Sequence, residues 1–133
     1  MRYMLDTDTC IYIIKKRPKS VLKRFEALEV GSVVMSVITQ GELEYGALGS
    51  RRSNEALKTL TNLARFIPAK AISNRVVTDY ADIRHTLRAK GQMIGGNDLW
   101  IAAHARSEDL TLVTNNVREF SRVPELKIEN WVG

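Results

Sequence analysis

Short apolar runs alternate along the chain with stretches whose apolar residues recur at helical spacing. The runs predict strands and the periodic stretches predict helices. The expected strands are Met1–Leu5, Val33–Ser36, Phe66–Ile67, Thr111–Thr114 and Lys127–Ile128. The expected helices are Thr9–Lys16, Pro18–Leu28, Thr39–Leu48, Asn54–Arg65, Asn74–Ala89, Leu99–Ala105 and Val117–Phe120. This alternation favours a mostly parallel sheet with helices on both faces, an α/β fold formed by residues 1–133 as a single domain.

Helix boundary signals support this division of the chain. Pro18 is well placed at a helix start, and Gly49 and Gly91 follow two helices as end signals. Asn97 is expected to cap Leu99–Ala105, which is almost entirely apolar. A helix that is apolar on all sides is buried, so this helix is expected deep in the core.

Composition excludes several classes of protein. The 133 residues are 44% hydrophobic and 26% charged, as in globular domains, and no apolar run reaches the length of a membrane helix. The start of the chain, Met1–Asp6, lacks the pattern of a signal peptide. The one cysteine, Cys10, excludes a disulfide framework and a cysteine zinc site. By elimination, the expected compartment is the reducing cytoplasm.

The charge balance points to a polyanionic partner. The net charge is +5, and residues 15–24 hold six basic residues and no acidic one. A basic domain favours nucleic acid, and Lys15, Lys16 and Arg17 are the expected RNA contacts. A solvated charged face is an equally ordinary explanation of the same residues.

Carboxylates follow the predicted strands. Asp6 ends the first strand, Glu42 lies in the first turns of the helix after the second, and Asp98 begins the buried helix. Asn116 follows the fourth strand, with Glu119 one turn further on. The carboxyl ends of parallel strands form the usual site in such sheets, so these side chains are expected to converge.

Each acid also has an ordinary structural explanation. Thr39 and Glu42 have the spacing of a capping box, and Asp98 could favour the positive end of a helix dipole. Convergence of all the acids by accident is harder to explain. Converging carboxylates repel one another, and a hard divalent cation such as Mg²⁺, or Mn²⁺ in its place, relieves that repulsion. Such an ion supports phosphodiester hydrolysis.

Other arrangements are weaker. His85 and His104 leave a paired-histidine ribonuclease open, although His104 lies in an apolar helix and is more typical of a core residue. Asp6-Thr7-Asp8 resembles the start of haloacid-dehalogenase-like phosphatases, in which Asp6 would be the nucleophile, but the later motifs of that class are missing. A non-enzymatic nucleic-acid-binding domain with purely structural acids is the other alternative.

Four segments together resemble the ordered motifs of PIN-domain nucleases, and in particular the VapC ribonuclease toxins. The segments are Leu5–Thr7, Ser36–Leu43, Ile94–Ala105 and Val113–Phe120. The third and fourth are the most specific of them. The resemblance extends from Met1 to Trp131, essentially the whole chain.

The resemblance implies an α/β/α sandwich and a Mg²⁺- or Mn²⁺-dependent endoribonuclease that acts on structured RNA such as initiator tRNA. It places Asp6, Glu42 and Asp98 at the three acidic metal positions and Glu119 at a further catalytic one. Asn116 stands where many members carry a fourth acid, and Asp8 stands where Asn or Ser is common. Thr114, beside Asn116 in the fourth motif, is a further accessory candidate. The resemblance also implies a toxin homodimer and a VapB-type antitoxin inhibitor.

Overall fold

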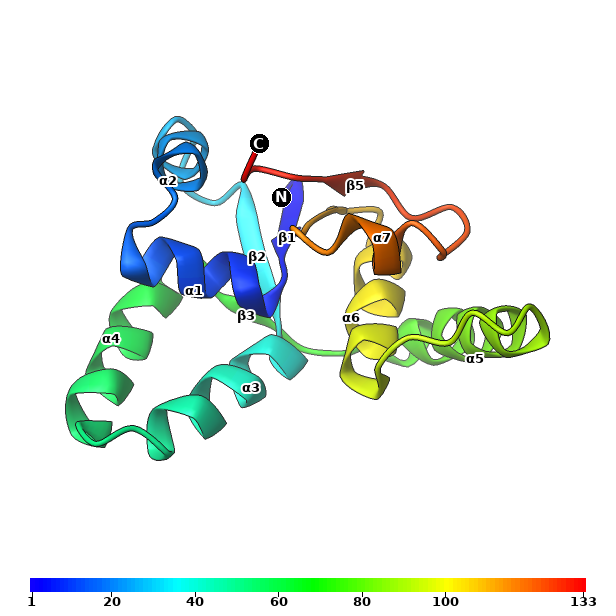
Figure 1. Cartoon of the computed structure of the whole chain (residues 1–133), viewed down its shortest axis with the longest axis horizontal. Helices are drawn as coiled ribbons and strands as arrows, with labels where there is room; N and C mark the ends of the chain where they lie inside the picture. Colours follow the sequence, from blue (N-terminus) through cyan, green and yellow to red (C-terminus); the bar gives the residue numbers. More distant parts are fainter.

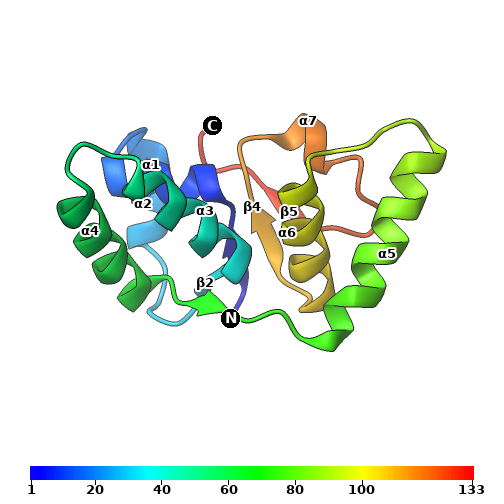
Figure 2. The same cartoon turned by 90° about the horizontal axis from the view of Figure 1, so that it is seen from below.

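The computed structural model describes all 133 residues, Met1–Gly133, as a parallel sheet between two layers of helices (Figures 1 and 2). The strands lie in the order β3-β2-β1-β4-β5, and every neighbouring pair is parallel. The strands are β1 Tyr3–Leu5, β2 Val33–Ser36, β3 Ala69–Lys70, β4 Thr111–Val113 and β5 Ile128–Glu129. The helices are α1 Thr7–Lys15, α2 Lys19–Glu26, α3 Val37–Leu48, α4 Ser53–Phe66, α5 Asn74–Ala89, α6 Gly96–Ser107 and α7 Val117–Phe120. The predicted α/β/α architecture is confirmed.

The third strand was predicted in the wrong place. Helix α4 continues through Phe66, because the Ile67 amide still donates to the Leu63 carbonyl, 2.9 Å away. Pairing with β2 starts only at Pro68, whose carbonyl accepts from the Met35 amide at 2.9 Å. Proline can accept but not donate, which suits the first position of an edge strand.

The start of α3 also differs from the prediction. The helix begins two residues early, at Val37, and the Ser36 hydroxyl accepts from the Ile38 amide at 3.1 Å. Thr39 is buried inside the helix. The predicted capping box of Thr39 and Glu42 is therefore wrong, because Ser36 is the N-cap. The side chain of Glu42 is thereby released from a capping role.

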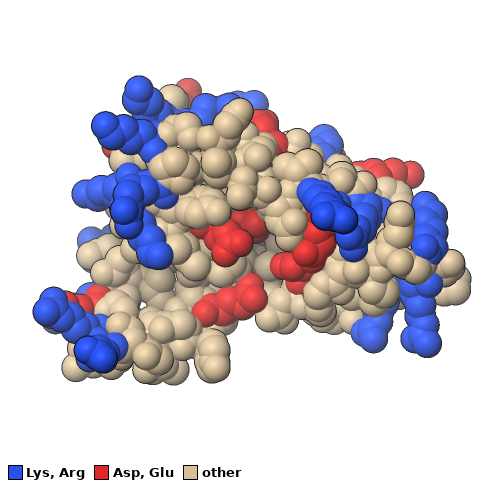
Figure 3. Space-filling model, in the orientation of Figure 1, with Lys and Arg blue, Asp and Glu red and all other residues tan.

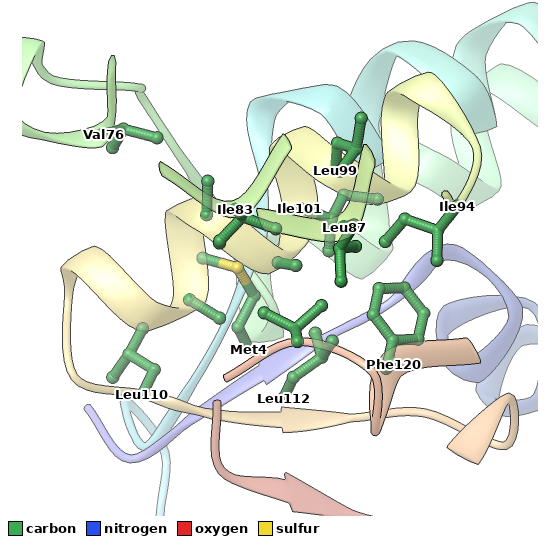
Figure 4. Packing of buried hydrophobic residues seen from close by; sticks show 14 of the residues in the cluster. Met4, Val76, Ile83, Leu87, Ile94, Leu99, Ile101, Leu110, Leu112 and Phe120 are labelled. Carbon is green, nitrogen blue, oxygen red and sulfur yellow. The ribbon is translucent and has the colours of Figure 1, made fainter. Parts of the chain in front are cut away.

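Alternate side chains of the strands enter two separate cores, one on each face of the sheet. Met4, Val34 and Leu112 point to the side covered by α5, α6 and α7, where Leu99, Ile83 and Phe120 meet them (Figure 4). The opposite core lies under α1, α2, α3 and α4 and takes the other strand positions. Its strand residues are Tyr3, Leu5, Val33, Met35 and Val113. The predicted apolar face of α5 and the burial of α6 are both confirmed.

Helices α5 and α6 are joined by a polar clamp as well as by the core. Arg106 of α6 is mostly buried and pairs with Asp79 at 2.7 Å and Asp82 at 2.8 Å, two acids one turn apart on α5. It also donates to the Pro124 carbonyl at 3.1 Å. Charge-assisted hydrogen bonds of this kind are stronger than neutral ones and fix the direction of α6.

The core beneath α6 can be tested at Ile83, which is fully buried. Ile83→Ala should lower the free energy of unfolding by about 2–5 kcal/mol, through lost apolar burial and the cavity left behind. Val77→Ala is the matched control on the same helix, because Val77 is 52% exposed. The control should change stability by less than about 0.5 kcal/mol. Equal urea midpoints for the two variants would contradict this packing.

Candidate active site

The register of the three central strands aligns one polar residue from each at the carboxyl edge of the sheet. Leu5 pairs with Met35 on one side and Val113 on the other. The next residues, Asp6, Ser36 and Thr114, therefore form a row, and all three are buried. Buried polar groups require hydrogen-bond partners, so this row sets the local geometry.

Asp6 is the N-cap of α1. Its Oδ1 accepts from the Thr9 amide at 2.9 Å, and the Thr114 hydroxyl is a second partner. Burial raises the pKa of Asp6, and the hydrogen bonds from Thr114 and Thr9 oppose that rise. Thr9 also donates to the Val113 carbonyl at 3.1 Å, which ties α1 to β4. The carboxylate is thus held rigidly at its strand end.

Glu42 extends toward Asp6 from α3. The Thr7 hydroxyl donates to its Oε1 at 2.5 Å, and the Asn97 amide donates to its Oε2 at 3.3 Å. Thr7 directly follows Asp6 in the chain, and Asn97 directly precedes Asp98. The segments that carry Asp6 and Asp98 therefore each contribute one hydrogen-bond donor that orients Glu42.

Asp98 and Glu119 form a directly interacting pair. Burial raises the pKa of Asp98 to about 7, and the neighbouring carboxylates Glu119, Glu42 and Asp6 add to this rise. The hydrogen bond with Asp98 lowers the pKa of Glu119. Glu119 also accepts from the Asn116 amide at 2.7 Å and from the Gly95 amide at 3.3 Å. The pair therefore holds one proton, on Asp98, below neutral pH.

These side chains surround one pocket of about 230 Å³. Its lining residues are Asp6, Thr7, Asp8, Glu42, Asp98, Asn116 and Phe120. Figure 3 shows Asp and Glu side chains near the middle of this face of the molecule. Asp8 is exposed in the first turn of α1, and Thr114 lies behind Asp6, outside the pocket lining. The structure thus brings together the predicted acids, with Glu119 joined to the lining through Asp98 and Asn116.

The pocket is lined by the oxygen ligands that a hard cation prefers, but these side chains do not already form a coordination shell. No cluster of three or more His, Cys, Asp or Glu side chains is arranged to hold a metal ion. Thr7 and Asn97 orient Glu42, and Asp98 is hydrogen-bonded to Glu119. Carboxylate oxygens are the ligands that Mg²⁺ prefers, and the pKa of Asp98 is raised mainly by burial and further by the neighbouring carboxylates. The residues therefore fit a divalent cation once they are deprotonated.

The predicted basic contacts lie along the margin of this face. Lys15, Lys16 and Arg17 are exposed at the end of α1, and none forms an ion pair. A groove of about 330 Å³ between α1, α3 and α4 is lined by Glu42 at one position and Lys15 at another. Figure 3 shows further basic side chains over α5 and α7, on the opposite side of the acids.

Three orienting groups had no predicted role in the site. They are the Thr7 hydroxyl, the Asn97 amide and the backbone amide of Gly95. Asn97 was expected to cap α6, but that helix begins at Gly96 with Gly95 as its N-cap. The one sequence signal was position, because Thr7 and Asn97 are direct neighbours of acids. A backbone amide such as that of Gly95 leaves no signal in side-chain chemistry.

The histidines and the cysteine lie outside the pocket. His104 is buried, with its Nδ1 2.8 Å from the Ser36 hydroxyl, and His85 is exposed on α5. Cys10 is fully buried, and burial raises the pKa of its thiol above the usual range. The interpretation of His104 as a core residue is confirmed, and the two histidines do not form a pair in the pocket.

Comparisons with known proteins agree with this geometry. The model of the PIN domain family matches residues 3–126. Ribonuclease VapC2 of Haemophilus influenzae is 41% identical over 132 residues, which cover 99% of each chain. The tRNA(fMet)-specific endonuclease VapC of Shigella flexneri is 39% identical, with 98% of each chain covered. The crystal structure of VapBC2 from Rickettsia felis, bound to a promoter DNA fragment, superposes with a TM-score of 0.91 at 38% identity, covering 98% of this chain and 99% of that one.

The fold and the acidic pocket define a PIN-domain protein. Within that class the chain belongs to the VapC ribonucleases, the toxins of VapBC toxin–antitoxin systems. The phosphatase alternative is overturned by this membership, and so is the non-enzymatic binding domain. None of the helices has the length and apolar character needed to cross a membrane.

The raised pKa of Asp98, caused by burial and by the neighbouring carboxylates, predicts a pH-dependent gain in stability when this carboxyl group is removed. The folded pKa, about 7, lies above the unfolded value of about 3.9. Ionisation therefore costs the folded state increasingly as pH rises between these values. Asp98→Asn removes that cost and keeps a donor for Glu119. In EDTA it should be more stable than the wild type by about 1–2 kcal/mol at pH 8, less than the full shift because the side chain is partly exposed.

Urea unfolding of the two proteins at pH 4 and pH 8 measures this difference. At pH 4 the midpoints should nearly coincide, because Asp98 is largely protonated in the folded state. Glu44→Gln is the control, since Glu44 is exposed on α3 without an ion pair. A gain of equal size at both pH values would show that charge repulsion is not its cause.

Proposed function

We propose that this VapC ribonuclease is a Mg²⁺-dependent endonuclease of structured RNA, with initiator tRNA as its substrate class and Mn²⁺ as a substitute metal. One observation carries the proposal: three acids from separate parts of the chain, Asp6, Glu42 and Asp98, line one pocket beside a conspicuously basic surface. The similarity to the tRNA(fMet)-specific endonuclease VapC of Shigella flexneri supports the substrate class. A cytoplasmic location follows from that substrate.

Asp6, Glu42 and Asp98 would hold the metal ion. A divalent cation in such a site activates a water molecule and stabilises negative charge on the phosphate. Asp6 is already fixed by Thr9 and Thr114, so it provides the rigid ligand. Glu42 has its two oxygens oriented by Thr7 and Asn97, so its carboxylate is positioned at the pocket lining.

Glu119 acts beside these ligands through Asp98. Its hydrogen bond takes the proton-bearing oxygen of Asp98, so it controls when Asp98 becomes an anionic ligand. Asn116 orients Glu119 and supplies a neutral amide at the pocket lining. Asp8 and Thr114 are accessory: Asp8 adds negative charge at the exposed rim, and Thr114 holds Asp6.

We propose a VapB-type antitoxin as the inhibitor and a homodimer as the active assembly. The antitoxin partner is supported by two solved relatives, VapBC2 of Rickettsia felis and VapBC-1 of nontypeable Haemophilus influenzae, which are VapBC structures. The groove between α1, α3 and α4 supports such a partner, because its lining is mainly apolar and includes Glu42 of the acidic pocket. A polypeptide bound there would cover the acids.

The decisive experiment removes one acid at a time. Asp6→Asn, Glu42→Gln and Asp98→Asn should each abolish RNA cleavage while the folded state is retained, because each removes a metal ligand. Glu119→Gln should lower the rate only about ten- to hundredfold, since Glu119 acts through another residue. Glu44→Gln is the matched control and should cleave normally.

Removal of the metal is a second, independent test. EDTA should stop cleavage, and Mg²⁺ or Mn²⁺ should restore it. Full activity of Asp98→Asn, or of the wild type in chelator, would refute the metal site.

Neutralising the basic residues at the end of α1 tests whether they contact the RNA. The triple change Lys15→Gln, Lys16→Gln and Arg17→Gln should weaken binding of any RNA and flatten its salt dependence, because fewer counterions are released. Metal affinity should stay unchanged. The control is Lys58→Gln, an exposed cation on α4. An unaltered affinity and salt slope in the triple variant would identify these residues as a solvated face only.

A further inference from the structure

Helix α3 presents an exposed aromatic ring one turn beyond Glu42. Tyr45 is 82% exposed. Val37 and Gly41 precede it at four-residue intervals and are also exposed, so the three lie on one side of the helix. A ring this exposed contributes little to the core. Its position beside a catalytic pocket therefore calls for a different explanation.

The surface beside Tyr45 is hollowed. An open depression of about 640 Å³ is lined along α3 by Val37, Gly41 and Tyr45 and at its other end by Thr7, Glu42 and Asn97. Thr7 and Glu42 also line the acidic pocket, so the depression and the pocket are continuous. Gly41 has no neighbour within 4 Å of where a Cβ would lie, which leaves the middle of the depression open.

The chemistry of the depression differs from that of the acidic pocket. Its only charged residue is Glu42, and no Lys or Arg lines it. A phosphate would meet no cation there and would be repelled by Glu42. A flat, neutral group with an aromatic face is the ligand that suits an exposed tyrosine over small and apolar side chains. In an RNA held at the adjacent acids, that group is a nucleobase.

We propose that Tyr45 stacks on an unpaired base of the RNA next to the phosphate held at the acidic pocket. This inference rests on the proposed ribonuclease function and assigns a substrate-positioning residue to it. The ring takes the face of the base, while the phosphate on the same nucleotide stays at the acids. Stacking is tolerant of sequence, so Tyr45 selects an unpaired nucleotide and not a particular base. Cleavage is thereby directed to loops of a structured RNA.

The test compares three changes on full-length protein in binding to a single-stranded RNA oligonucleotide, followed by stopped-flow fluorescence anisotropy in Mg²⁺ before cleavage becomes detectable, because the acids need a cation to hold the phosphate. Tyr45→Phe keeps the ring and should bind as the wild type does. Tyr45→Leu keeps apolar bulk without the ring and should bind about ten- to hundredfold more weakly. Its salt slope should stay unchanged, because no phosphate contact is lost. Leu48→Ala is the control, since Leu48 is exposed on α3 outside the depression.

Oligonucleotides with a single abasic nucleotide, scanned along the chain, identify the stacked base. One abasic position should weaken wild-type binding as much as Tyr45→Leu does, and combining the two should cost no more than either alone. Equal affinity of Tyr45→Leu and wild type would overturn the proposal while leaving the ribonuclease function intact. The proposal would also be overturned if Tyr45→Leu weakened the binding of every RNA equally, whichever nucleotide is abasic, and also changed the sedimentation coefficient of the protein. That result would place Tyr45 in a protein interface. A wild type that neither binds nor cleaves RNA would refute both proposals.

Discussion

In a parallel sheet all strands end at the same edge, and here that edge carries buried polar side chains in adjacent strands. Asp6, Ser36 and Thr114 follow paired residues and are buried, so each needs a hydrogen-bond partner inside the protein. Asp6 accepts hydrogen bonds from the first turn of α1 and from the Thr114 hydroxyl, and Ser36 accepts one from the first turn of α3. The hydrogen bonds of these buried side chains therefore fix where α1 and α3 begin, and the start of α3 determines the position of Glu42.

Repulsion among the carboxylates is the second constraint on the pocket. Hydrogen-bond donors moderate the negative charges: Thr7 and Asn97 for Glu42, and Asn116 and the Gly95 amide for Glu119. Burial and the neighbouring carboxylates raise the pKa of Asp98 to about 7, so its ionisation near neutral pH costs the folded state free energy. The protein accepts this cost in stability at the place where its chemistry requires negative charge, as functional sites commonly do.

The sequence predicted those features that depend on periodicity and strand order. The apolar face of α5, the burial of α6 and the acids at the strand ends follow from such patterns, and the structure agrees. The third strand was misplaced, because two residues beside Pro68 contain no period and only the pairing with Met35 decides where the strand begins. The roles of Asn97 and Thr7 were missed because they depend on Glu42, which is remote in the chain. The resemblance to VapC ribonucleases supplied the roles of the acids, which spacing alone left open.

The positions of the acids along the chain have a consequence for the synthesis of the protein. Asp6 and Glu42 lie in the first third of the chain, whereas Asp98 and Glu119 lie in its last 36 residues. β1, at the centre of the sheet, lacks its neighbour β4 until those residues have left the ribosome. A nascent chain thus carries only half of the acidic pocket for most of its synthesis. The ribonuclease therefore cannot assemble its complete acidic pocket until its synthesis is nearly finished.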